Sequence, residues 1–319
     1  MTVTGKQGLN KIPKRHKNPF INDIIQNPLL YIMLIPMVIF YILFCYVPMY
    51  GAIIAFKDFT IGKGIIDSPW TSMWGFGHFI DFIKGPFFGR TFGNTLTLSL
   101  GLIICAFPAP IIFAVLLNEI KNPYYKKTIQ TVTYIPHFIS IMVVCGLLYT
   151  FLGRDGFIND IIVMFGGKRS NLLANPNYFK PIFIISDIWQ QLGWDSIIYL
   201  SAMVSIDQGL YEAASIDGAG RFRRIIHVTL PGIIPTIVTL FILRMGGIFT
   251  IGYEKIILLY NDMTYESADV ISSFVYRRGL LESDYSYSTA VGLFNSILNF
   301  IVLCITNAIS RRVSETSLW

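Results

Sequence analysis

The side chains best placed to do chemistry lie in a polar insert, residues 211–231, between two apolar stretches. The insert reads YEAASIDGAGRFRRIIHVTLP, and its small residues predict one or two helical turns that another protein can approach closely. Glu212, Arg221, Arg223 and Arg224 supply charged anchors at its rim. This pattern indicates binding to a partner rather than catalysis. From the residues alone, an ordinary positively charged loop explains the insert equally well.

A second group of charges lies inside apolar stretches, where ionisable side chains are costly and usually face protein or water. Asp187 and Asp195 fall roughly on one helix face, and Arg244 follows in the next apolar stretch. We expect a buried ion pair between Arg244 and either carboxylate, which would set the register of the two helices. Lining a polar translocation path is the other interpretation. A proton relay would also fit the carboxylates, but it leaves the insert around Glu212 unexplained.

The elements that carry these residues must be membrane-spanning helices. The chain is 53% hydrophobic with a mean hydropathy of +0.57, and its apolar stretches exceed the roughly 20 residues that a helix needs to cross a bilayer. Helices are expected because a spanning segment must satisfy its backbone hydrogen bonds internally. The sequence therefore predicts an all-α, polytopic fold of six helices. The predicted spans are residues 28–56, 92–118, 129–152, 181–206, 231–252 and 286–310.

The basic residues predict the orientation of these spans. Residues 1–17 contain five Lys or Arg and no acid, which places the N-terminus in the cytoplasm of a bacterial cell under the positive-inside rule. Six spans return the C-terminus, with Arg311 and Arg312, to the cytoplasm. The insert then lies on the cytoplasmic side, between the fourth and fifth spans. Basic membrane flanks account for the net charge of +6, so we expect lipid contact and no nucleic-acid partner.

Two external segments should be structured. Residues 154–180 begin with an apolar pattern at helical spacing, which predicts a short amphipathic helix lying on the outer surface. Residues 253–284 have helical patterning but too many charges to cross lipid. We therefore expect this segment to fold back over the outer mouth of the protein.

Catalytic and metal sites are not indicated. The four cysteines fall within apolar spans, and the four histidines are scattered without metal-ligand spacing. A polytopic transferase or protease would need carboxylates or a nucleophile gathered at one membrane depth, and none are found. The chain also lacks a GxxxxGK[ST] phosphate-binding loop; residues 166–169 come nearest but lack the first glycine and the hydroxyl. ATP, if used, must bind another chain.

The spacing within the insert resembles the EAA loop of the membrane subunits of binding-protein-dependent ABC importers. The matching positions are Glu212-Ala213-Ala214, Asp217-Gly218-Ala219, Arg221-Phe222, Val228 and Leu230-Pro231. Val228 is a small departure, because Ile is commoner there. The resemblance covers most of the chain. The segment GYEKIILLYNDMTYESADVISSFVYRRGL and the ending SETSLW are similar to a sugar-type sub-branch, the polysaccharide or oligosaccharide permeases.

This resemblance implies a type I importer fold and a non-catalytic permease that moves an oligosaccharide or polysaccharide fragment inward. It implies a cytoplasmic ATPase dimer that holds ATP and Mg, a homologous second permease forming a heterodimer, and an extracellular solute-binding protein. The insert becomes the coupling helix. By resemblance the coupling residues are Glu212, Ala213, Ala214, Asp217, Gly218, Ala219 and Arg221. The expected parts are a tail (1–27), a first helix with an external loop (28–90), the permease domain (91–312) and a second tail (313–319).

A saccharide substrate would need aromatic faces and amide groups within the spans. Asn295 and Asn299 are four residues apart and share a helix face. Hydrogen bonding between helices explains such residues as well. The candidate translocation path consists of Trp189, Gln190, Trp194, Asp195, Tyr199, Asn295 and Asn299. An ion-coupled carrier, a permease for a non-sugar solute and a purely structural subunit are the alternatives.

Overall fold

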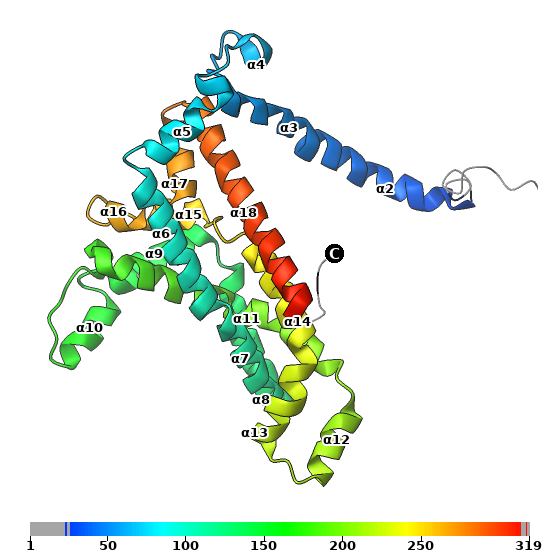
Figure 1. The fold of residues 1–319 in the computed structure, drawn as a ribbon. Helices are drawn as coiled ribbons and strands as arrows, with labels where there is room; N and C mark the ends of the chain where they lie inside the picture. The colour runs from blue at the N-terminus through cyan, green and yellow to red at the C-terminus, as the bar shows by residue number, and fades with distance from the viewer. Residues whose placement is uncertain (1–22, 24–25, 314–316, 318–319) are drawn as a thin grey trace, which may run out of the picture. The chain divides into compact units, whose positions relative to one another are not determined.

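The computed structural model describes Asp23, residues 26–313 and Ser317, so most of the predicted tails, 1–27 and 313–319, lies outside the described residues. The described chain is predominantly helical (Figure 1). Within it, extended pairing is limited to one bridge between Lys57 and Trp70. The all-α prediction is therefore confirmed for this part of the chain. Two compact units, Met1–Ile53 and Ile54–Trp319, are described separately.

The first unit is dominated by one long apolar helix. It runs through α2 (Pro28–Tyr41), the π-helical turn η1 (Ile42–Tyr46), α3 (Val47–Met49) and the start of η2 (Tyr50–Phe56). Pro28 occupies the first turn, where its missing N–H removes no helical hydrogen bond. None of the side chains of α2 is buried within the chain. A helix that is apolar on all sides suits a lipid environment.

Membrane-scale helices make up the frame of the second unit. α6 (Phe88–Gly101) continues through the π turn η4 (Leu102–Ala106) into α7 (Pro108–Asn118). α11 (Pro176–Val204), α14 (Leu230–Met245) and α18 (Tyr285–Val313) correspond to the predicted fourth, fifth and sixth spans. Among the described residues, five segments are long and apolar enough to cross a membrane: Pro28–Phe56, Phe88–Asn118, Ile141–Met164, Arg221–Met245 and Tyr285–Arg312.

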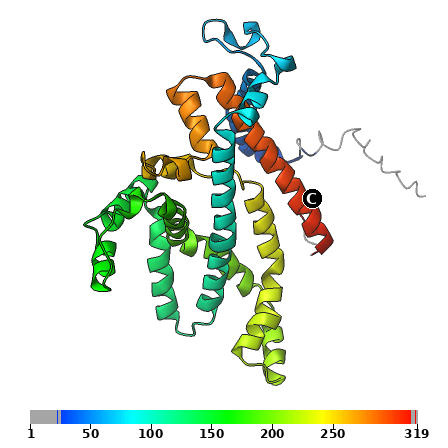
Figure 2. The same cartoon turned by 60° about the vertical axis from the view of Figure 1, so that its left-hand side comes forward.

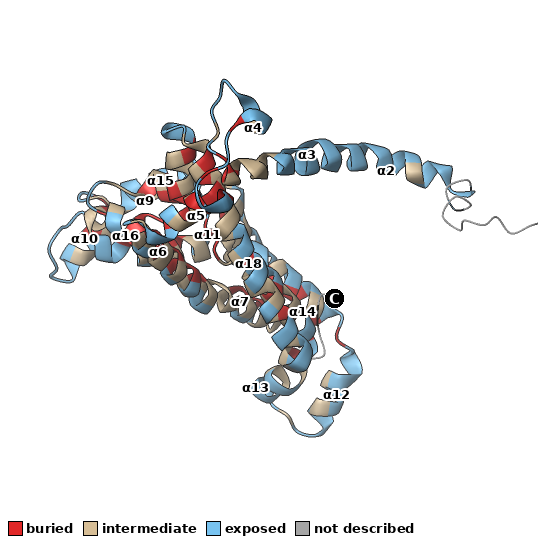
Figure 3. Ribbon diagram, turned by 45° about the horizontal axis from the view of Figure 1, so that its top comes forward, coloured by how far each residue is buried: buried red, intermediate tan, exposed pale blue. Residues whose placement is uncertain are grey.

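The fourth predicted span is not among these five segments, because α11 carries polar residues along much of its length. It is nevertheless central, and it packs against α7, α14 and α8 (Pro123–Tyr134). Gly193 permits the approach to α8, since a Cβ at this position would collide with the carbonyl oxygen of Thr133. Neighbouring helices therefore cover the buried residues of α11 (Figure 3).

The third predicted span, 129–152, is not one continuous helix. α8 ends at Tyr134, a 3₁₀ turn η5 (Ile135–Phe138) follows, and a new helix, α9 (Ile141–Leu152), begins after Ser140. Pro136 favours the break because it has no N–H to donate. Ser140 starts the new helix by accepting a hydrogen bond from the N–H of Val143 at 3.4 Å. The predicted short amphipathic helix is found as α10 (Phe157–Met164).

Residues 253–284 form short helices that pack into the second unit instead of crossing it (Figure 2). They are α15 (Tyr253–Leu259), α16 (Tyr265–Ala268), α17 (Ile271–Tyr276) and the π turn η8 (Arg277–Leu281). Ile256, Leu259 and Val270 join a core with side chains from α6 and α11. The predicted helical character is confirmed. The remaining helices are α4 (Gly64–Asp67), η3 (Met73–Gly75), α5 (Gly77–Lys84), η6 (Leu172–Ala174), α12 (Gln208–Ile216), α13 (Arg221–Arg224) and η7 (Ile225–Thr229).

Candidate functional site

The predicted coupling residues lie on a helix–turn–helix formed by α12 and α13. Asp207 begins α12 by accepting a hydrogen bond from the N–H of Gly209 at 2.9 Å. Gly218 ends it with a φ of +75°, a left-handed conformation that glycine adopts without strain. The Ala219 N–H then donates to the Ala214 carbonyl oxygen at 2.9 Å, which closes the turn. This helix–turn–helix projects from one end of the helical bundle of the second unit (Figures 1 and 2).

Internal hydrogen bonds brace this helix–turn–helix. The hydroxyls of Tyr211 and Thr229 lie 3.0 Å apart, and Arg224 donates to the Ser215 hydroxyl at 3.2 Å. α13 also continues through the π turn η7 directly into α14. A displacement of α12 would therefore be transmitted to the predicted fifth span. We define the coupling loop as residues 207–229.

The charged side chains on the outer surface of the coupling loop form no ion pair with the part of the chain that the structure describes. Glu212, Asp217 and Arg221 are exposed, and within the described residues none of them forms an ion pair. Ile216 is 87% exposed and Phe222 is 74% exposed. Large apolar side chains this open, next to unpaired charges, are typical of a surface that another protein covers.

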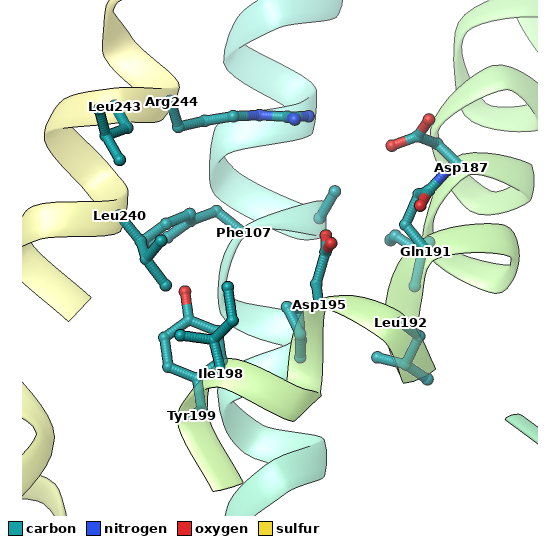
Figure 4. A pocket seen from close by; sticks show the side chains of 13 residues that line it. Phe107, Asp187, Gln191, Leu192, Asp195, Ile198, Tyr199, Leu240, Leu243 and Arg244 are labelled. Atoms are coloured by element: carbon teal, nitrogen blue, oxygen red, sulfur yellow. The ribbon is translucent and has the colours of Figure 1, made fainter. Parts of the chain in front are cut away.

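A cavity of about 440 Å³ lies between α7, α11 and α14 (Figure 4). It adjoins a second cavity of about 410 Å³, and Asp187, Leu243 and Arg244 line both. The residues lining the first are Ala106, Phe107, Pro110, Asp187, Ile188, Gln191, Leu192, Asp195, Ile198, Tyr199, Leu240, Leu243 and Arg244. The combination of apolar walls with a few polar groups is typical of small-ligand sites.

The charges around these cavities pair differently from the prediction. Asp187 lies 3.8 Å from Lys255, whose ammonium also donates to the Phe183 carbonyl oxygen at 3.2 Å and lies 4.6 Å from the centre of the Phe183 ring. Lys255 belongs to α15, which folds into the bundle. Within the described residues, Arg244 has no carboxylate within ion-pair distance. The expected pairing of Arg244 with Asp187 or Asp195 is therefore absent.

Two residues of the predicted path, Asp195 and Tyr199, line the first cavity. Others make internal contacts. Asn299 accepts from the Phe249 N–H at 2.9 Å and donates to Thr250 at 2.9 Å, while Asn295 donates to the Phe249 carbonyl oxygen at 3.3 Å. These two amides thus hold the turn after α14, which agrees with the alternative of hydrogen bonding between segments.

The remaining path candidates lie around the break between α8 and α9. Gln190 is buried and donates to the Ile139 carbonyl oxygen at 3.1 Å. Trp194 stacks on His137 with ring centres 4.3 Å apart, whereas Trp189 is 46% exposed and lines neither cavity. These contacts indicate that Gln190 and Trp194 hold α11 against the broken third span.

Gln191, a further amide of the fourth predicted span that could bind a sugar, also lines the first cavity. Its Oε1 accepts a hydrogen bond from Nδ1 of His137 at 2.8 Å. Its spacing agrees with this position, because Asp187, Gln191, Asp195 and Tyr199 recur at intervals of four residues and therefore share one face of α11.

A second charged cluster was not predicted at all. The carboxylate of Asp269, 1% exposed, accepts from Arg90 at 3.1 Å, from Arg277 at 3.1 and 3.2 Å and from Ser273 at 2.9 Å. The ring of Tyr265 lies between the two guanidinium groups, 4.9 Å from Arg90 and 5.0 Å from Arg277. Burial raises the pKa of Tyr265, so its hydroxyl stays neutral. We call these five residues the Asp269 clasp.

The clasp secures residues 253–284 to α6. Asn94 donates to the Asp269 carbonyl oxygen at 3.0 Å and to the Glu266 carbonyl oxygen at 2.8 Å. The hydroxyl of Thr95 accepts from the Ile271 N–H at 2.9 Å. Since the partners are more than 170 positions apart in the sequence, only the folded chain brings them together.

Comparison with known proteins identifies the family. The binding-protein-dependent transport system inner membrane component family matches residues 106–315. The polygalacturonan/rhamnogalacturonan transport system permease protein YteP of Bacillus subtilis (strain 168) is 40% identical over 307 residues, covering 96% of this chain and 95% of that protein. Protein LplB of the same organism is 41% identical over 291 residues, covering 91% of each chain.

A solved structure shows the same fold. A chain of the bacterial alginate ABC transporter, in complex with its alginate pentasaccharide-bound periplasmic protein, superposes with a TM-score of 0.86 and 41% identity. The match covers 94% of this chain and 100% of that chain. This chain therefore belongs to the inner membrane components of binding-protein-dependent transport systems, as a multi-pass, non-catalytic permease subunit.

Proposed function

We propose that this chain is a permease subunit that moves an oligosaccharide or polysaccharide fragment from an external binding protein into the bacterial cytoplasm. Relatives support the substrate class, since one is a polygalacturonan/rhamnogalacturonan permease protein and another belongs to an alginate transporter. The two adjoining cavities between the helices, of about 440 and 410 Å³, are of a size that holds small ligands. Asp195 and Tyr199 line the path, and Asp187 faces it from beside Lys255.

The exposed, internally braced coupling loop is the observation that carries this proposal. A separate ATPase dimer, holding ATP and Mg, docks on Glu212, Asp217, Arg221 and the apolar side chains beside them. Closure of that dimer moves α12 and α13 as one body, and the continuous connection through η7 tilts α14. A homologous second permease completes the path. The coupling loop and both chain termini lie in the cytoplasm, and residues 91–312 form the permease domain.

Reconstitution with the ATPase, the second permease and the binding protein tests this function. In Glu212→Lys, we expect ATP-dependent uptake of labelled oligosaccharides to fall to background. The stimulation of ATPase activity by loaded binding protein should also be lost, because the reversed charge opposes docking. Glu254→Lys is the matched control, since Glu254 is exposed on α15 without an ion pair among the described residues. Normal uptake in a membrane-inserted Glu212→Lys variant would overturn the proposal.

A further inference from the structure

Arg244 is a cation in a predicted membrane-spanning helix, and among the described residues it forms no close ion pair. Its guanidinium projects from α14 across the cavity toward the face of α11 that carries Asp187 (Figure 4). Within the described residues it has no carboxylate within ion-pair distance. A charged side chain at such depth is costly and is retained where it meets an anion or water in a path.

No carboxylate of the described residues forms a close ion pair with Arg244, although Asp195 lies near enough to interact with it electrostatically across the cavity. Asp187 is held on the opposite wall by Lys255 at 3.8 Å. Asp195 lines the cavity but makes no ion pair among the described residues. The cavity therefore has a positive wall on α14 and, on α11, a polar wall made of the Asp195 carboxylate and the Gln191 amide. A ligand that presents an anion on one side and hydroxyls on the other would satisfy both walls.

Resting on the saccharide function proposed above, we propose that Arg244 binds the carboxylate of an acidic saccharide, a uronate unit, as the saccharide moves through the path. The planar guanidinium can donate two parallel hydrogen bonds to one carboxylate. Asp195 accepts hydrogen bonds from the sugar hydroxyls, and the NH2 group of Gln191 donates to them. This arrangement orients each unit, because reversing it would place the carboxylate against Asp195.

The position of Arg244 between the two cavities fits contact with a saccharide as it moves through the protein. It lines both adjoining cavities, together with Asp187 and Leu243. A saccharide that moves from one cavity to the other must therefore pass the guanidinium. The relative named for polygalacturonan and the transporter described as importing the acidic polysaccharide alginate both handle uronates, which agrees with this selectivity.

The test compares two probes of equal length in the complete reconstituted transporter: an oligogalacturonide and its fully methyl-esterified, uncharged form. The measured quantity is the ratio of free-acid to ester uptake. Because the same binding protein serves every variant, its own selectivity cancels when the ratios are compared. In Arg244→Gln we expect the ratio to fall by about tenfold or more, as for the loss of a hydrogen bond to a charged group.

Two further variants sharpen the test. Arg244→Lys retains the charge but loses the planar fork, so its ratio should lie between those of the unaltered protein and Arg244→Gln. Arg311→Gln makes the same chemical change at an exposed site near the end of α18 and should leave the ratio unaltered.

An unaltered ratio in Arg244→Gln would overturn the inference. An equal loss of both uptakes, with the complex assembled, would instead assign Arg244 to an ion pair with the second permease. Preference of the unaltered protein for the ester would reject the uronate subsite and leave saccharide transport standing. Uptake of neither probe, although the ATPase is active, would count against both proposals.

Discussion

The coupling loop and residues 253–284 both connect membrane-scale helices, yet they use their charges in opposite ways. In the coupling loop, Glu212, Asp217 and Arg221 are exposed and unpaired within the described chain. In the other segment, Asp269 is buried and bound by Arg90 and Arg277. The charges of the loop are open to solvent, as the proposed docking of another protein requires, whereas the segment uses its charges to hold its own fold.

The contrast follows from solvation. An exposed charge keeps its water and costs little until a partner displaces that water. A buried carboxylate has lost its water and needs charged, hydrogen-bonded partners in its place. Substitutions should therefore separate the two regions: those in residues 253–284 should lower stability, and those in the coupling loop should stop transport.

Asp269→Asn should give the largest loss of stability. The amide cannot neutralise Arg90 and Arg277. We therefore expect the free energy of unfolding to fall by about 3 kcal/mol, the low end for a broken buried ion pair. The low end applies because the two arginines are 25% and 20% exposed. Thermal unfolding of the purified permease complex measures the effect. Asp262→Asn, an exposed change in the same segment, should cost under about 0.5 kcal/mol; equal losses would contradict the role of the clasp.

Thr95→Val tests the attachment of α17 to α6. Valine has nearly the same shape but cannot accept the hydrogen bond from the Ile271 N–H. A buried donor left without an acceptor should cost about 1–3 kcal/mol. The control is Thr97→Val on the exposed side of α6, which should have little effect on the same unfolding curve. If the two variants unfold alike, the Ile271 hydrogen bond does not stabilise the segment.

Tyr265→Leu removes the aromatic face between the two arginines of the clasp. Two cation–π contacts are lost, at 4.9 and 5.0 Å, and we expect a cost of about 1–2 kcal/mol in unfolding free energy. Tyr265→Phe keeps the ring and should retain most of that stability. A Phe variant as unstable as the Leu variant would show that the hydroxyl, rather than the ring, matters.

Gly218→Val should affect stability least and transport strongly. A β-branched residue at a φ of +75° is strained by about 1–2 kcal/mol, and an exposed turn can relieve that strain by changing shape without unfolding the bundle. Nothing lies within 4 Å of a Cβ here, so no clash contributes. Uptake should fall about tenfold or more with the unfolding midpoint unaltered. Gly220→Ala, at a φ of −67°, is the control; a shifted midpoint for Gly218→Val would remove the contrast between the regions.

Local signals in the sequence predicted the all-α fold and the coupling loop. Long uncharged stretches indicated helices that cross a bilayer, and the small residues around Gly218 indicated a short helix and turn. Both signals arise from residues that are close to one another in the sequence. The break at residues 135–140 was missed, although Pro136 and Ser140 mark it, because the surrounding residues are apolar enough to mask the boundary.

The charge partners could not be predicted in the same way. Arg244 was expected to pair with a carboxylate on α11, since the two helices are adjacent in the sequence. Instead α15 folds into the bundle, and Lys255 forms the ion pair with Asp187. Asn295 and Asn299 were candidates for the path, and they hold the turn at Phe249 and Thr250. Side-chain partners depend on how nonadjacent helices meet, which local patterns do not encode.

The sequence by itself determined which segments are apolar helices and where a polar loop interrupts them, because hydropathy and backbone preference act between near neighbours. Only the tertiary structure decided which charges are satisfied. Asp269 forms an ion pair with Arg90, which belongs to a helix far earlier in the sequence. Arg244, beside the cavity, forms no close ion pair among the described residues. The physical reason is that a charge is stabilised by whatever lies within a few ångströms of it, and folding selects those neighbours.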